Sequence, residues 1–275
     1  LKNPSSRHGD DMAKLPFGVI PTPLGTITTG NEISAKPAAH LKEFLDIGMT
    51  WKSSGNTNLW VRMDLGTAKP IDFVSMIGAN AQSGTTIRIR LGDTQAEVDG
   101  TADYDSGALA FISPSITSDD GLYESHHELP SLQTKQWCRI DIGGHTGDFE
   151  AAKLILGQRV TPSRYYSAGF EMGIEDQGSI DFGRWGVAEI TSGMIMRSLK
   201  FELGWLTEAE EMTMFAPLMK KLGTRNPALW CFDPDPTTYR QAKTYFGTVK
   251  ENPFSVGGKV KPGIFSREFS ILSLI

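Results

Sequence analysis

Three acidic residues close together, Asp99, Asp103 and Asp105, form the pattern in this chain that comes nearest to a cation site. Hard cations such as Ca²⁺ take several oxygen ligands from one tight loop. The stretch lacks the complete spacing of an EF-hand loop and the bidentate glutamate that ends it. We therefore expect a solvated loop here, and the sequence predicts neither a metal site nor a cofactor.

Two further pairs have residue types that take part in catalysis or metal binding. His126 and His127 are adjacent, and neighbouring side chains on a strand point to opposite faces, which is poor geometry for chelation. Asp233 and Asp235 alternate with prolines, whereas a glycosidase needs two carboxylates that face each other across the scissile bond. We expect a surface loop at the histidines and a rigid turn at the aspartates. Since the chain also has no nucleophile elbow, phosphate loop or nucleotide fingerprint, we predict no catalytic residues and no enzyme.

A carbohydrate-binding surface is the other chemistry that the residue types allow. Aromatic rings stack on the apolar faces of sugars, and side-chain amides hydrogen-bond to sugar hydroxyls. Trp60, on an alternating strand, is equally suited to packing in a core or an interface. The candidate glycan-contacting residues are Trp51, Asn56, Asn58, Asn80 and Tyr104.

The elements that must position these residues are β-strands. Leu59–Leu65 alternates apolar and polar residues, as a strand with one buried face does. Gly66–Pro70 is expected to break it, and Ile71–Gly78 is nearly continuous in apolar residues, which predicts a strand covered on both faces. Thr85–Leu91 alternates again. We expect these three antiparallel strands to form the centre of a β-sandwich.

The rest of the chain predicts a mainly β fold built from tandem β-sandwich domains. We expect an arm at 1–16, a first sandwich at 17–158 and a second β-rich domain at 159–275, with the boundary in Val160–Ser167, where Pro162 and polar residues follow a completed strand. One short helix is expected near 207–222. It begins with the capping box Thr207-Glu208-Ala209-Glu210, and Pro217 should kink or interrupt it.

Composition restricts the class of protein further. With 39% apolar and 21% charged residues among 275, the chain has the make-up of a globular protein rather than a disordered one. A net charge of −5 gives no general attraction to nucleic acid, and no apolar run is long enough to predict membrane insertion. Cys138 and Cys231 lie in apolar surroundings, which favours buried free thiols over a single disulfide.

The first domain resembles a discoidin-type (galactose-binding-like) jelly roll. The residues that carry this resemblance are Leu59–Leu65 with Gly66, Pro70–Val74, Gly78-Ala79-Asn80 and Thr86–Leu91. In that family a strand ending in a Leu-Gly turn leads to an apolar strand and an asparagine-containing loop. The resemblance implies a β-sandwich over about half of the chain.

Both halves together are similar to minor tail proteins of long-tailed bacteriophages. The matching stretches are Tyr104–Gly107 followed by Pro114, Gly204–Thr207 with its capped helix, Asp233-Pro234, Tyr245–Gly247 and the final Phe265–Ile275 strand. The resemblance implies a structural component of a tail tip or baseplate, assembled in the host cytoplasm. Its partners would be other tail proteins and copies of itself in a ring. We expect segments 1–16, 92–107 and 115–135 to form the contacts with these partners. The alternative is a carbohydrate-binding module that contacts glycans on the host surface.

Overall fold

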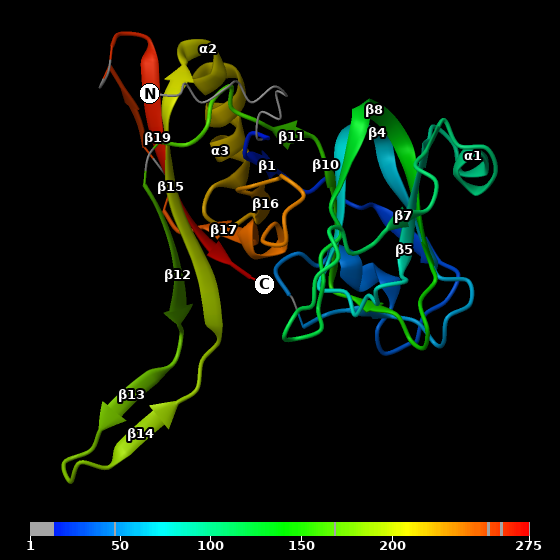
Figure 1. Cartoon of the computed structure of the whole chain (residues 1–275), viewed down its shortest axis with the longest axis horizontal. Helices are drawn as coiled ribbons and strands as arrows, with labels where there is room; N and C mark the ends of the chain where they lie inside the picture. The colour runs from blue at the N-terminus through cyan, green and yellow to red at the C-terminus, as the bar shows by residue number, and fades with distance from the viewer. Residues whose placement is uncertain (1–13, 47, 168, 252–253, 259–260, 275) are drawn as a thin grey trace, which may run out of the picture.

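The computed structural model describes residues 14–46, 48–167, 169–251, 254–258 and 261–274, and in these ranges it consists mainly of antiparallel β-sheet. Two halves lie beside each other, each built around one large sheet (Figure 1). The mainly β fold predicted from the sequence is confirmed. Residues 1–13 of the expected arm lie outside the described ranges.

The first half folds around a sheet of seven described strands in the order β10-β4-β8-β5-β6, with β2 and β7 on β4 and β5. The strands are β2 (Thr26–Thr29), β4 (Trp60–Ile77), β5 (Thr86–Gly92), β6 (Tyr104–Asp105), β7 (Leu109–Ala110), β8 (His127–Gly143) and β10 (Lys153–Gly157). A separate pair joins β3 (Trp51–Lys52) to β9 (Glu150–Ala151). Register shifts between β4 and β8 bend the sheet over a core, as β-bulges do.

The pairing of the central strands differs from the expected one. The break at Gly66–Pro70 does not divide the segment: β4 runs through it as one strand, with Gly66 in the left-handed region at φ +76°. The strand β5 pairs with β8, and β8 lies between β4 and β5. Sequence neighbours therefore do not form the simple three-stranded unit that we expected, because β8, which follows both in the sequence, inserts between them.

The second half is built on a sheet of eight described strands in the order β11-β1-β16-β17-β19-β15-β12, with β18 on β19. The strands are β1 (Phe17–Val19), β11 (Arg159–Val160), β12 (Phe170–Asp176), β15 (Ile195–Thr207), β16 (Ala228–Cys231), β17 (Thr244–Val249), β18 (Ser255–Gly257) and β19 (Ile264–Ser273). The strand β1, expected in the first sandwich, pairs on both sides in this sheet.

An apolar cluster joins the two halves. Side chains of β4 alternate between two cores: Val74 and Met76 pack in the first sandwich, whereas Phe73 and Ile77 point into the junction. There they meet residues of β1, β10, β16 and β17. The prediction that Ile71–Gly78 is covered on both faces is confirmed, because the second half covers the outer one.

Helical segments are short. The predicted capping box is formed: the Thr207 hydroxyl accepts a hydrogen bond from Glu210 N (3.2 Å), and the Glu210 carboxylate accepts one from Thr207 N (2.9 Å). After α2 (Glu208–Glu210), a π-type turn (Glu211–Phe215) precedes α3 (Ala216–Leu222), which places the irregularity directly before Pro217. Helix α1 (Gln95–Asp99) and the 3₁₀ turns Ala38–Lys42 and Gln241–Lys243 complete the set. None of the helices in the described ranges has the length and apolar character to cross a membrane.

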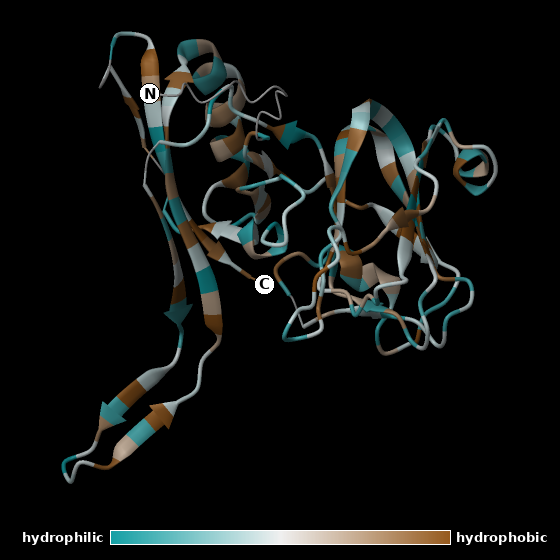
Figure 2. Cartoon of the chain, in the orientation of Figure 1, coloured by the Kyte–Doolittle hydropathy of each residue, from teal (hydrophilic) through white to brown (hydrophobic). Residues whose placement is uncertain are grey.

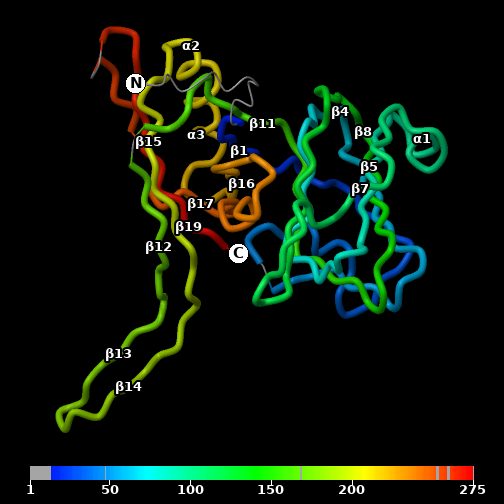
Figure 3. The backbone as a smooth tube through the Cα atoms, viewed as in Figure 1, coloured from blue at the N-terminus to red at the C-terminus, as the bar shows by residue number. Residues whose placement is uncertain are grey.

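A long β-arm projects from the second half. It is formed by β12 and β15, which pair from Phe170↔Phe201 to Asp176↔Ile195, and it continues into the two-stranded tip β13 (Ser179–Phe182) and β14 (Ala188–Thr191). The tip extends well away from both halves, and brown apolar segments run along it (Figures 2 and 3). This arm is the most exposed part of the described structure.

Candidate functional site

Trp51, one of the two aromatic residues of the glycan-binding prediction, lies inside the first sandwich. Its relative exposure is 0%, its indole packs edge-on against Phe149 with ring centroids 5.6 Å apart, and its Nε1 donates to Asn31 O at 3.1 Å. No face of the ring is open to a sugar. The prediction of a stacking role for Trp51 is therefore corrected, because the strand that carries it is covered by its own fold.

Two of the predicted amides do converge. Asn56 Nδ2 donates to His145 O (3.3 Å), and Asn80 both donates to Asp148 O (2.9 Å) and accepts from Glu150 N (2.9 Å). Both side-chain amides hydrogen-bond to backbone groups of residues 145–150, at one end of the sandwich.

The other two predicted residues lie elsewhere. Asn58 adopts a left-handed conformation (φ +54°) in the turn that leads into β4. Tyr104 pairs with Leu91 at the far end of β5, and its ring packs against the sandwich core. The structure thus gathers Asn56 and Asn80 around one loop and leaves Asn58 and Tyr104 outside that group.

The acidic cluster faces cationic side chains of the sheet. The partners are Arg62 and Arg139 for Asp99, Lys135 for Asp103 and Arg88 for Asp105. The hydrogen bond from Arg88 lowers the pKa of the Asp105 carboxyl to about 2. In the described ranges no group of three or more His, Cys, Asp or Glu side chains is arranged to hold a metal.

His126 packs at the junction of the halves and His127 begins strand β8, so the expected surface loop is wrong. His126 Nε2 lies 3.2 Å from Glu128 Oε1, and its ring packs edge-on against Phe73 at 5.0 Å. His127 is 7% exposed, and burial lowers the pKa of its imidazole to about 4. Phe17 of β1 covers His126 from the second half, and no local sequence pattern predicts that contact.

The predicted turn at Asp233 and Asp235 contains two carboxylates with separate partners. Asp233 Oδ2 accepts a hydrogen bond from Lys243 Nζ at 2.5 Å, whereas Asp235 Oδ1 accepts one from Lys14 N at 3.1 Å.

A groove of about 880 Å³ opens where the halves meet. Its wall from the first sandwich is formed by most of segment 116–124 together with Asn80 and Glu150. The wall from the second half includes Arg197 and Gln241. The groove lies within the range of volumes that small-molecule sites occupy.

Glu124 and Gln241 form a polar pair in the wall of this groove. Glu124 N donates to Gln241 Oε1 at 3.2 Å, while Glu124 Oε2 and Gln241 Nε2 are both buried and have no hydrogen-bond partner among the described residues. Burial raises the pKa of the Glu124 carboxyl to about 8; Arg197 works against this shift and Asp120 adds to it. A carboxyl that stays protonated near neutral pH can donate a hydrogen bond as well as accept one.

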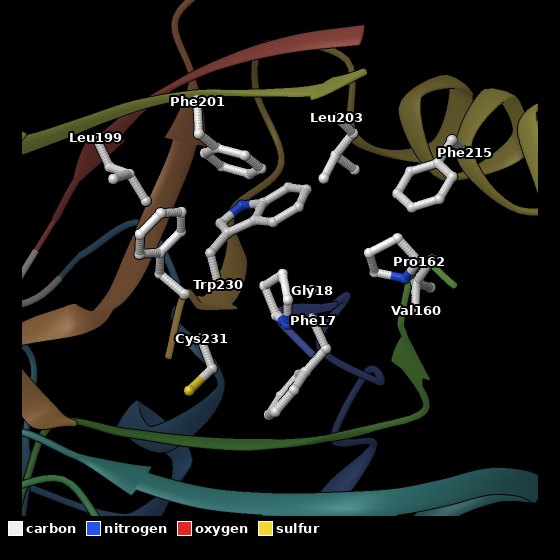
Figure 4. A pocket seen from close by; sticks show the side chains of 12 residues that line it. Phe17, Gly18, Val160, Pro162, Leu199, Phe201, Leu203, Phe215, Trp230 and Cys231 are labelled. Atoms are coloured by element: carbon white, nitrogen blue, oxygen red, sulfur yellow. The ribbon is translucent and has the colours of Figure 1, made fainter. Parts of the chain in front are cut away.

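A second hollow lies within the second half and is apolar. It is bordered by β1, β11, β15, β16 and the π-type turn before α3, with Phe201, Phe215 and Trp230 around it (Figure 4). Its volume is about 10 Å³, which holds one water molecule at most. This hollow is a packing defect of the core and offers no room for a ligand.

The arm carries the largest group of exposed apolar side chains. Eight of them have at least 60% of their surface open: Ile174, Ile180, Phe182, Trp185, Val187, Ile190, Met194 and Ile195. Ile180 and Ile190 face each other across the tip strands.

Sequence reasoning located the arm strands but not their projection. Strands β12, β13 and β15 lie within 159–275, where the sequence predicts a second β-rich domain. A sequence signal for the projecting arm does exist, and it is the high density of apolar residues across 174–195 around a glycine-rich turn. Helix α1 was missed as well, although Thr94 and Glu97 form a capping box that the sequence displays.

No family model and no curated protein matches the sequence. Solved structures that align with about half of the chain include chitosan-binding module 1 from a chitosanase/glucanase of Paenibacillus sp. IK-5, at 14% identity over 50% of this chain and 97% of that one (TM-score 0.36). A fucose-binding module of Streptococcus pneumoniae aligns at 8% identity over 55% and 99% (TM-score 0.38). The family 32 carbohydrate-binding module of C. perfringens NanJ, solved with galactose, aligns at 16% identity over 51% and 98% (TM-score 0.37). Similarities at this level do not assign the chain to a family.

Proposed function

We propose that this chain is a structural protein that assembles with further copies of itself through its projecting β-arm, as a component of the tail tip of a long-tailed bacteriophage. The observation that carries the assembly role is the set of eight apolar side chains on the arm, each at least 60% exposed. The assignment to a phage tail is supported by the sequence stretches similar to minor tail proteins. No catalytic residue is part of the proposal.

The exposed apolar area of the arm is sufficient for a protein interface. A large apolar side chain that is mostly open leaves on the order of 100 Å² in contact with water. Eight of them amount to about 800 Å², the share of one partner in a standard interface. Burial of this area stabilises an assembly, whereas a lone chain leaves it in water.

A second copy of the chain is the partner that the structure favours, because a separate apolar patch lies at the other end of the same sheet. This patch contains Trp205 of β15, Val256 of β18 and Phe254, which are 42%, 50% and 88% exposed. Ten residues of β15 separate Ile195 at the arm from Trp205, a distance of about 33 Å at the usual rise of a strand. Contact between the arm of one copy and this patch of the next copy would be head-to-tail, and such contacts close into rings when the rotation allows it.

Sedimentation velocity of the full chain over a range of micromolar concentrations tests the assembly role. The wild type should self-associate, and the variant Phe182→Ser/Trp185→Ser should remain monomeric with an unchanged melting temperature, since both side chains are exposed. Tyr239→Ser, at a residue 67% exposed outside both patches, is the control and should assemble normally. A monomeric wild type at every concentration would refute assembly through the arm.

The placement in a phage tail has its own test. Antibody-gold labelling of intact particles from the source culture should mark the tail tip. Absence of the protein from intact particles, and from disrupted ones whose epitopes are accessible, would contradict a virion role without affecting the conclusion about self-association.

Carbohydrate binding is the second candidate function. The observation that favours it is the position of Asn80, which hydrogen-bonds to residues 148 and 150 and also lines the groove of about 880 Å³. Such a site would allow a tail component to contact glycans of the host surface. Saccharide titration of the full chain is the test, in the form described below.

A further inference from the structure

The groove between the halves has a lining that suits a neutral ligand rich in hydroxyl groups. Its walls combine hydroxyl, amide and charged side chains with a larger share of apolar surface, to which residues such as Ile77 and Ala152 contribute. Several of the charged groups in and around it already have partners. Glu150 pairs with Lys36, Asp120 accepts hydrogen bonds from Ser118, and Arg197 donates to two backbone carbonyls, of Ala242 and Thr244.

Charge disfavours an anionic occupant, because Asp119, Asp120 and Glu150 line the sandwich side of the groove. In the described ranges no cluster of carboxylates is arranged to hold a metal ion. A neutral molecule enters without a charge penalty. Polar groups that are buried without a partner cost free energy, so a ligand that supplies both donors and acceptors gains from meeting them.

We propose that the groove between the two halves binds a neutral mono- or oligosaccharide, with the Glu124 carboxyl and the Gln241 amide as its central polar contacts. This proposal rests on the second candidate function, carbohydrate binding, and adds the site. The ligand would lie between the halves, with one wall from each, so neither half alone contains the complete site.

Isothermal titration calorimetry of the full chain with galactose, fucose and N-acetylglucosamine tests the site. Gln241→Leu keeps the approximate size of the side chain and removes its amide, and we expect about tenfold weaker binding. The matched control is Asn56→Ala, because Asn56 is exposed on the loop cluster outside the groove, and it should bind as the wild type does. Melting curves of both variants establish that they are folded.

The pH dependence of saccharide affinity provides a second test, which involves the Glu124 carboxyl instead of the Gln241 amide. A saccharide in the groove removes the remaining water around the carboxyl and penalises its ionised form further. The charged groups that face Glu124 are Asp120 of the same segment and Arg197 of β15. Affinity of the wild type should fall as the pH rises above about 8, whereas Glu124→Gln should bind equally well on both sides of that pH.

The possible results distinguish failure of the proposed site from failure of carbohydrate binding in general. Binding that is lost in Asn56→Ala and unchanged in Gln241→Leu would overturn the groove as the site and leave carbohydrate binding in place at the loop cluster. The same pH dependence in the wild type and in Glu124→Gln would overturn the contact with Glu124. Absence of binding to all three sugars would overturn both the site and the second candidate function.

Discussion

Phe73 is the side chain whose removal should show most directly that the two halves fold as one unit. It is 1% exposed, belongs to a strand of the first sandwich, and points into the apolar cluster of the junction. Its ring packs edge-on against Phe17 at 5.1 Å and against His126 at 5.0 Å. Phe17 pairs with β16 in the second half, so this one ring contacts both halves.

Phe73→Ala should lower the free energy of unfolding by about 3–5 kcal/mol, the usual cost of a buried Phe→Ala change with its residual cavity. The lost edge-on contacts account for about 0.5–1.5 kcal/mol of this for each ring pair. Urea unfolding followed by tryptophan fluorescence and circular dichroism measures the change. Because the junction would be weakened, we also expect the two signals to separate in the variant while they coincide in the wild type.

Phe182→Ala is the matched control, since it makes the same chemical change at a residue that is 72% exposed on the arm. Its effect should stay within about 0.5 kcal/mol, as for other surface substitutions. Equal effects of the two substitutions, or a loss below about 1 kcal/mol for Phe73→Ala, would refute the conclusion that the junction is a continuous core.

Two further predictions concern groups buried by tertiary contacts. Cys138 and Cys231 are both 0% exposed, and burial raises the pKa of both thiols, that of Cys231 to about 12. We expect no reaction of the native protein with a thiol reagent and labelling of two thiols after unfolding; rapid labelling of the native chain would contradict this burial. For His127 the folded pKa of about 4 lies below the ordinary 6.5, so the unfolded state takes up the proton first and stability is lost as the pH falls from 6.5 toward 4. The loss of unfolding free energy amounts to about 3 kcal/mol at most. Urea unfolding at pH 6.5 and pH 4 measures it, and His127→Gln should abolish this difference. An unchanged pH dependence of stability in that variant would show that other groups control the loss.

The sequence was sufficient for elements whose signals are local. The helix near 207–222 was predicted because Thr207 and Glu210 are three residues apart and satisfy each other's backbone groups in any tertiary setting. Strands such as Leu59–Leu65 and Thr85–Leu91 were predicted from their alternation, since one face of each meets the sandwich core.

The candidate sites depended on contacts that no local pattern contains. Trp51 has the residue type of a sugar-stacking platform, but its burial was decided by Phe149, almost a hundred residues away. Glu124 and Gln241 meet only because the two halves pack together, and each alone looks like an ordinary surface residue in the sequence.

What the sequence by itself determined is therefore the mainly β class, most of the strands and the capped helix, because propensity, alternation and capping act within a few residues. The tertiary structure alone decided that β8 lies between β4 and β5, that Phe73 is covered from outside and that a polar groove forms at the junction. It also decided that the strands of 170–195 extend into solvent instead of packing in a second sandwich. Strand partners and docked surfaces are chosen by contacts between distant segments, and their free energy depends on the whole fold.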